Sequence, residues 1–199
     1  METRAAAGAA QPSGQRTRMR LPPRVSLRTA AAADVPAIAA IYREQVATGT
    51  ASFEYDPPAV AEMMCRYDAS VTAGFPWFVA DDDQAGVIGY TFASPYRPRP
   101  GYRYTVEDSV YVAPAAAGRG IGAALLARLI EACTARGDRL MVAVIGDVAN
   151  GASIAVHRKL GFVEVGRMPG VGWKFDLWIE SVLMQRALGE GAAAAPALR

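Results

Sequence analysis

One histidine stands among the 199 residues, in the segment SIAVHRKLGF at residues 153–162. An imidazole has an ordinary pKa of about 6.5, so His157 can hold or release a proton at working pH. A lone histidine on a helix is nevertheless more often a structural residue than a catalytic one. Its type alone therefore leaves three roles open: an acid, a positioning contact or a buried structural side chain.

A glycine-rich turn, AAAGRGIG, lies between a predicted strand and a long apolar helix that Gly137 ends. Gly118, Gly120 and Gly122 let the backbone approach a ligand closely, and the helix N-terminus adds positive potential. The turn lacks the Gly-Lys-Ser/Thr ending of a P-loop, and its G-x-G-x-G spacing departs from the dinucleotide fingerprint. It predicts a pyrophosphate site; a glycine-rich helix entry without a ligand is the alternative.

The order of predicted elements is β-α-α-β-β-β-α-β-α-β-β. Short apolar runs such as PWFVA, VIGYTFA and LMVAVIG indicate strands, and helical spacing of apolar residues follows Asp34, an expected N-cap. Asp56 before Pro57 predicts a second helix start. The pattern favours a mixed α/β (α+β) domain, with one layer of helices on each side of a largely antiparallel sheet.

Composition excludes several classes of protein. Without the five Arg and one acid of residues 1–24, the chain from 25 to 199 has 16 basic and 18 acidic residues. A mildly acidic domain lacks the basic field of nucleic-acid binders. No stretch has the length of a membrane span. Cys65 and Cys133 match no metal or redox spacing, so we expect no metal site. From the charge balance and the lack of a long apolar stretch we expect no nucleic-acid partner and no membrane contact. We also expect a cytoplasmic location. Residues 1–24 and 189–199 are predicted to be disordered extensions around a domain at 25–188.

Several ordered motifs resemble a known family. GRGIGAALL after SVYV, followed by N-x-x-S-x-x-x-H-x-x-L-G-F from Asn150, resembles the acetyl-CoA core of the GNAT N-acetyltransferases. YRYTVEDSVYV, SIAVHRKLGF and GWKFDLWIESVLMQR are similar to the phosphinothricin and methionine sulfoximine N-acetyltransferase branch. The likeness runs from about residue 26 to about residue 188. It implies the GNAT acyl-CoA N-acyltransferase fold, with about six to seven strands and about four helices, acetyl-CoA as co-substrate and a homodimer.

The resemblance also implies the cofactor contacts. The turn would hold the pyrophosphate through backbone amides, and the strand before it would hold pantetheine, with the Val110 N–H as oxyanion donor. Ser153 would cap its helix or contact the cofactor, and the cap is favoured. Ala117 stands where the family usually has Arg or Gln, which predicts weaker cofactor binding, partly restored by Arg119. The expected contacts are Val110, Tyr111, Val112, Gly118, Arg119, Gly120, Ile121, Gly122, Ala123, Asn150 and Ser153.

Glu107, in TVEDSVYV, is the expected general base. By resemblance it faces the substrate amine, through a water, while its neighbour Asp108 points to the opposite face of a regular strand. A solvated acid at a strand end is the alternative. His157 occupies a position where many GNAT enzymes have a tyrosine that protonates the leaving thiolate, so the resemblance favours a catalytic contribution from this histidine, as acid or as positioning contact.

The expected substrate is a small amine that bears a carboxylate, such as phosphinothricin or methionine sulfoximine. Three arginines on the loop before the Glu107 strand suit bidentate pairing with a carboxylate, and Tyr96 and Tyr102 can wall the pocket. The substrate-side candidates are Phe53, Tyr96, Arg97, Arg99, Arg103, Thr105, Val106, Lys174 and Phe175. A polyamine, an antibiotic or a protein N-terminus as substrate, or a non-catalytic acetyl-CoA-binding module, are the alternatives.

Overall fold

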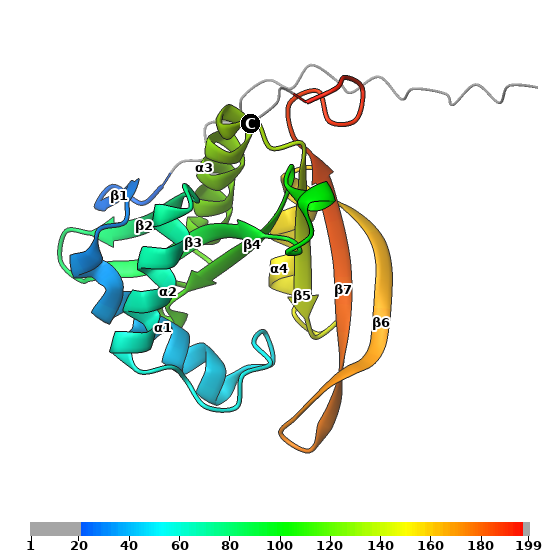
Figure 1. Cartoon of the computed structure of the whole chain (residues 1–199). Helices are drawn as coiled ribbons and strands as arrows, with labels where there is room; N and C mark the ends of the chain where they lie inside the picture. Colours follow the sequence, from blue (N-terminus) through cyan, green and yellow to red (C-terminus); the bar gives the residue numbers. More distant parts are fainter. Residues whose placement is uncertain (1–20, 197–199) are drawn as a thin grey trace, which may run out of the picture.

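The structure is a computed structural model that describes residues 21–196. This part of the chain forms one sheet of seven strands, in the order β1-β2-β3-β4-β5-β7-β6, with four α-helices (Figure 1). The observed order of elements confirms the predicted mixed α/β fold. The bounds are β1 Val25–Thr29, α1 Val35–Thr48, α2 Val60–Thr72, β2 Trp77–Asp82, β3 Gly86–Pro95, β4 Thr105–Val112, α3 Ile121–Arg136, β5 Leu140–Gly146, α4 Gly151–Lys159, β6 Val163–Lys174 and β7 Leu177–Ala187.

The only parallel strand pair in the described sheet joins β4 to β5, and it is short. β4 pairs with β5 at Thr105, Val106 and Glu107, whereas its antiparallel ladder with β3 continues to Val112. Beyond Glu107 the two strands diverge (Figure 1). The backbone groups that β4 turns toward this opening are not taken up by a β5 ladder, so they are available to a ligand that enters between the strands.

Alternation along the strands builds two cores on opposite faces of the sheet. Trp77, Val79 and Tyr90 pack beneath α1 and α2, while Phe78 and Ala80 belong to the core under α3. α3 lies close to the sheet because β3 carries Gly89 where a Cβ would stand 3.2 Å from Leu125. The predicted layer of helices on each side of the sheet is therefore confirmed.

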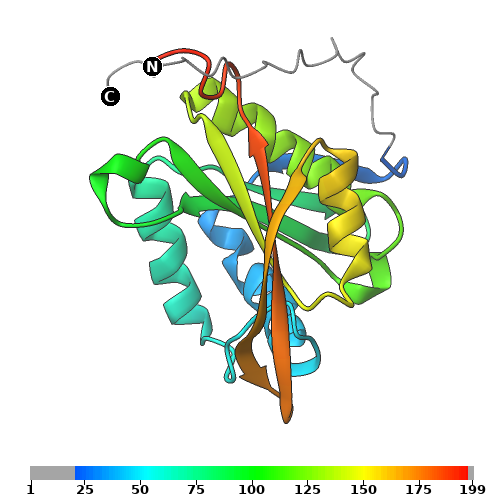
Figure 2. The same cartoon turned by 90° about the vertical axis from the view of Figure 1, so that its right-hand side faces the viewer.

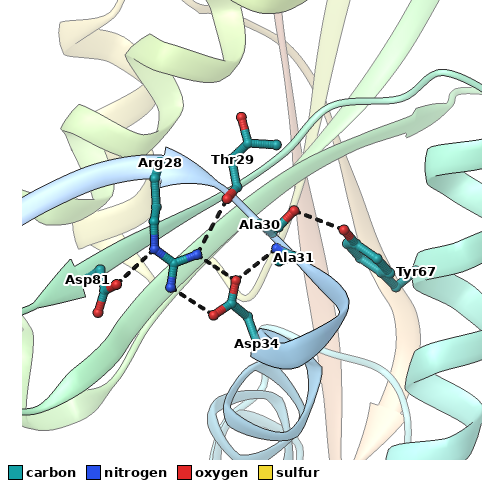
Figure 3. Close-up of polar contacts among 7 residues, drawn as sticks. All are labelled: Arg28, Thr29, Ala30, Ala31, Asp34, Tyr67 and Asp81. Carbon is teal, nitrogen blue, oxygen red and sulfur yellow. Dashed lines mark hydrogen bonds and ion pairs between the residues drawn. The ribbon is translucent and has the colours of Figure 1, made fainter.

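Arg28 of β1 joins the edge of the sheet to the start of the α1 layer (Figure 3). Its guanidinium donates to both carboxylate oxygens of Asp34, at 2.6 and 2.8 Å, and to Asp81 at 2.8 Å. Asp34 also accepts from the Ala31 N–H, and it gives α1 no side-chain cap. Asp34 is the N-cap residue of α1, as predicted, but its carboxylate accepts from Arg28 and Ala31 instead of from the helix amides. The second helix begins later than expected, at Val60, after the paired prolines.

The β6–β7 hairpin extends beyond the rest of the molecule (Figure 2). Its turn places Phe175 and Asp176 at φ 53° and 58°, the left-handed region used by tight hairpin turns. Tyr55 donates its hydroxyl hydrogen to the carbonyl of Trp173. The tip of the hairpin thus contacts the loop that follows α1.

The ends of the described chain are placed against the domain. Leu21 packs on the core under α3, and Arg139 donates to the carbonyl of Ala195 at 3.2 Å. Residues 1–20 and 197–199 lie outside the described part, and the domain bounds at 25 and 188 stay predictions. Among residues 21–196, no helix is both long and apolar enough to cross a membrane.

Candidate active site

β4 presents different chemistry on its two faces. Tyr111 packs with the core under α1, its ring centre 5.2 Å from that of Tyr42, and Glu107 shares its face by alternation. Val110 packs against the core under α3, and Asp108 shares that face. Glu107 therefore lies on the α1 side, at the last residue before β4 leaves β5, with Asp108 directly behind it.

Glu107 is partly buried, and its pKa is raised above the ordinary range. Burial contributes most, because it penalises the charged carboxylate, and the negative charge of Asp108 adds to the effect. The positive charge of Arg97 opposes both. A carboxylate with a raised pKa is a better proton acceptor near neutral pH, so the site suits general-base chemistry.

The loop before β4 brings Arg97, of its three arginines, into electrostatic interaction with Glu107. The Arg97 guanidinium lies 5.1 Å from the centre of the Tyr96 ring, which packs edge-on against Tyr102. Arg103 instead lies over Tyr104, and Arg99 is exposed. Arg97, which is also exposed, is therefore the one of the three arginines whose charge acts on the Glu107 carboxylate.

The glycine turn has the backbone conformation that an anion site requires. Gly118 and Gly120 have φ values of 74° and 79°, and Gly120 is the N-cap of α3. A Cβ at either position would meet no atom within 4 Å, so the outer side of the turn is open. The first N–H groups of a helix have no acceptor within it, and here they come from Ile121, Gly122 and Ala123. Arg119 is exposed and lies 3.4 Å from Asp82.

These features fit acetyl-CoA. The turn offers free amides and a helix N-terminus to a pyrophosphate, and the opening between β4 and β5 offers backbone groups along Val110–Val112 to an amide-containing arm. On the face of β4 under α3, Val110 and Val112 lie next to Gly122. A Cβ added at Gly122 would be 3.8 Å from the Val110 side chain and 3.6 Å from that of Val112, so the strand packs closely against the start of α3. Asn150 and Ser153 begin the helix on the other side of the opening.

α4 is capped differently from the expectation. The Asn150 side-chain oxygen accepts from the Ser153 N–H at 3.2 Å, so Asn150 is the N-cap and Ser153 lies inside the first turn. The favoured cap at Ser153 is wrong, because α4 already begins at Gly151 and Asn150 accepts from the N–H of its third residue, Ser153. Ser153 instead serves His157: its carbonyl oxygen lies 2.8 Å from His157 Nδ1.

His157 is only 4% exposed, and both ring nitrogens have partners. Nδ1 contacts the Ser153 carbonyl, and Nε2 lies 3.0 Å from Asp108 Oδ2. Burial taken alone lowers the pKa of His157, but the hydrogen bond and the charge of Asp108, with the Ser153 carbonyl, outweigh burial and raise it. The histidine therefore lies on the face of β4 opposite to Glu107, where it contacts Asp108, the residue next to Glu107.

Lys174 is 1% exposed, and its ammonium group forms hydrogen bonds with backbone carbonyls of the protein itself. Its ammonium donates to the carbonyls of Val46, Gly49 and Ser52, at 2.7, 2.9 and 2.8 Å. These bonds use all three ammonium hydrogens, and burial lowers the pKa of Lys174. The structure therefore places Lys174 as the anchor of the loop after α1 and leaves it no hydrogen for a substrate.

The other substrate-side candidates lie in different elements of the structure. Phe53 lies against Gly172, where a Cβ would stand 2.3 Å from its ring, and Phe175 is half exposed at the hairpin turn. Val106 is fully buried, while Thr105 pairs with Leu140 of β5.

Two residues at the site were not singled out from the sequence. The Tyr42 hydroxyl forms a hydrogen bond with the Ser52 hydroxyl at 2.9 Å, and the Tyr42 ring packs on Tyr111. Asp108 was given a direction but no partner. The sequence held one signal for the pairing of Asp108 with His157: an acidic residue next to Glu107 in a chain with a single histidine.

Comparison with known proteins identifies the surroundings of this site. A family model described as "Acetyltransferase (GNAT) family" matches residues 35–162. The chain is 48% identical over 163 residues to a phosphinothricin N-acetyltransferase of Alcaligenes faecalis, covering 82% of each chain. It is 43% identical to an L-methionine sulfoximine/L-methionine sulfone acetyltransferase of Pseudomonas paraeruginosa, covering 80% of this chain and 92% of that one.

A solved structure agrees with these relatives. A GNAT superfamily phosphinothricin acetyltransferase from Sinorhizobium meliloti, in complex with acetyl-CoA, superposes with a TM-score of 0.84 at 48% identity. The match covers 87% of this chain and 94% of that one. The sequence identity, the fold and the open glycine turn thus all agree with these acetyltransferases.

Proposed function

Since the chain belongs to the GNAT family of N-acetyltransferases and uses acetyl-CoA as co-substrate, we propose that it acetylates the α-amino group of a small amino-acid-like substrate. Phosphinothricin and methionine sulfoximine are the first candidates, because relatives at 48% and 43% identity carry those names. The observation that carries the proposal is Glu107, partly buried where β4 leaves β5, with Arg97 acting on it from the neighbouring loop.

In the proposed reaction, Glu107 removes one proton from the substrate ammonium, through a water, and leaves a neutral amine. The amine nitrogen then attacks the thioester carbonyl carbon, and the Val110 N–H stabilises the oxyanion that forms. When the carbon–sulfur bond breaks, the second proton lost by nitrogen goes to the thiolate. Acetyl-CoA supplies the acetyl group. Over the whole reaction the products are the N-acetyl compound, free CoA and one proton.

The contacts of His157 support a positioning role over direct protonation of the thiolate. Its Nε2 is engaged by Asp108 and its Nδ1 by Ser153, and the ring is buried. A donor to the thiolate would need a hydrogen directed into the opening. We therefore assign His157 to the support of β4.

Substrate charge provides the test of the proposed function. Converting the carboxylate of the substrate to an amide is expected to lower kcat/KM by about tenfold or more, because a charge-assisted hydrogen bond contributes roughly 1.5–3 kcal/mol. Arg97→Met should lower turnover of the acid and reduce this preference, whereas Arg43→Met, on the exposed side of α1, is the matched control. The measurement is release of free CoA with a panel of amines.

Two other results would redirect the proposal. Equal turnover of acid and amide forms would contradict the amino-acid reading and favour a polyamine, an antibiotic or a protein N-terminus. Binding of acetyl-CoA without CoA release for any amine would favour a non-catalytic module.

A homodimer is part of the proposal. The β6–β7 hairpin exposes large apolar side chains near its turn, and Trp178, at 70% exposed, packs edge-on against Trp173. Exposed apolar patches of this kind mark protein–protein contacts. A second copy of the chain is the proposed partner, in line with the family resemblance. The exposed apolar side chains of the hairpin near its turn are Val171, Trp173, Phe175, Leu177 and Trp178.

Trp178→Asp is expected to convert a dimer into a monomer, because an aspartate would be buried without a partner at the centre of the interface. Light scattering coupled to gel filtration measures the mass of each form. Arg158→Asp, an exposed change on α4, is the control. A wild-type chain that elutes as a monomer of 21.0 kDa at all concentrations would contradict the dimer.

A further inference from the structure

A buried charge pair braces β4 directly behind Glu107. Asp108 is the first residue of β4 beyond the three that pair with β5. Its Oδ2 lies 3.0 Å from Nε2 of His157, on α4, and the two side chains are 2% and 5% exposed. Because α4 follows β5 in the chain, this contact links the two sides of the opening where the strands separate.

The acceptors around His157 determine where its protons lie. The Ser153 carbonyl can only accept, so Nδ1 donates to it. A carboxylate also only accepts, so Nε2 donates to Asp108 when the ring is charged. Burial alone would lower the pKa of His157, but the hydrogen bond and the charge of Asp108 raise it, which favours the charged ring.

The surroundings of Asp108 make this partner necessary. Its second oxygen, Oδ1, is buried and has no hydrogen-bond partner among the described residues. The other titratable groups that its charge reaches are Glu107 and Tyr111 of β4 and Cys133 of α3, which supply no positive charge. A buried carboxylate is costly unless it is paired, and His157 is the cation that pairs with it.

We infer that Asp108 is a positioning residue for the proposed acetyl transfer: together with charged His157 it fixes β4 at the opening, so that Glu107 and the Val110 N–H keep their places. Asp108 and Glu107 are consecutive residues on opposite faces of one strand, so a displacement of one moves the other. The structural part of the inference stands alone, and its kinetic part rests on the proposed function.

The lone histidine makes the pair directly observable, because an NMR titration of tag-free protein reports only His157. In the wild type the ring should keep its proton above about pH 6.5, the ordinary pKa. In Asp108→Asn its pKa should fall below that value, since burial remains and the charge is gone. Asp83→Asn, in the exposed β2–β3 turn, is the control. A wild-type pKa below the ordinary value, or an unchanged pKa in Asp108→Asn, would overturn the pair.

The kinetic arm tests the positioning role. Asp108→Asn and His157→Gln should each lower kcat by about tenfold with little change in the KM for acetyl-CoA, and the double variant should be no slower than the slower single variant, because both act as one unit. Losses that multiply, or unchanged kcat with only a lower melting temperature, would overturn the role. Full activity of Glu107→Gln would instead refute the proposed base, and the NMR result on the pair would be unaffected.

Discussion

Glu107→Gln should lower kcat by about 10²–10⁴-fold, the usual span for loss of a general base. Glutamine keeps the shape of the side chain on the α1 face of β4 but cannot accept the proton of the substrate ammonium. Acetyl-CoA affinity should change little, because the open turn at Gly118–Gly122 lies at the other end of the strand. Steady-state CoA release and calorimetry with acetyl-CoA measure the two effects separately.

The pH profile adds a second signature for the same residue. Burial and the charge of Asp108 raise the pKa of Glu107, so the wild-type activity should fall, as pH decreases, at a pH above the ordinary Glu value of about 4.3. This acid limb should vanish in Glu107→Gln. Glu44→Gln, on the exposed side of α1, is the matched control. Wild-type rates in Glu107→Gln would mean that the amine arrives neutral or that another group removes its proton.

Gly120→Val should weaken acetyl-CoA binding by about 10²-fold, as expected if two charge-assisted hydrogen bonds of at least roughly 1.5 kcal/mol each are lost. Gly120 is the N-cap of α3 at φ 79°, a conformation that a β-branched residue rarely adopts. The substitution both redirects the first amides of the helix and places a side chain on the open outer side of the turn. Calorimetry with acetyl-CoA checks the affinity.

A matched glycine separates the site from general backbone strain. Gly74, after α2, has the same φ of 79°, and a Cβ there would likewise meet no atom within 4 Å. Gly74→Val should therefore cost similar stability but leave acetyl-CoA affinity intact. Equal affinity in Gly120→Val and the wild type would show that the pyrophosphate binds elsewhere.

Local patterns in the sequence determined the elements and the turn. Apolar runs, helical spacing and helix-start residues predicted the strands and α-helices in their observed order, because each of these signals depends only on residues close in the chain. Gly118 and Gly120 could be assigned to a phosphate turn for the same reason: their positive φ values are a local backbone property. Glu107 could be placed at a strand start, and alternation gave Asp108 the opposite face.

What the tertiary structure decided were the contacts between elements. Asp34 stands at the predicted N-cap position of α1, but its carboxylate pairs with Arg28 of β1 and not with the helix amides. The Lys174 ammonium donates to the carbonyls of Val46 in α1 and of Gly49 and Ser52 in the loop that follows, all more than 100 positions away in the chain.

The pairing of Asp108 with His157 joins residues 49 positions apart, and which arginine of the loop before β4 acts on Glu107 depends on the conformation of that loop. A side chain's type fixes which hydrogen bonds and charges it can offer, but its partner is set by packing between distant segments, which no local pattern records. The sequence by itself therefore determined the chemistry available to this protein, and the packing of β4 against β5 and α4 decided which residues could use it.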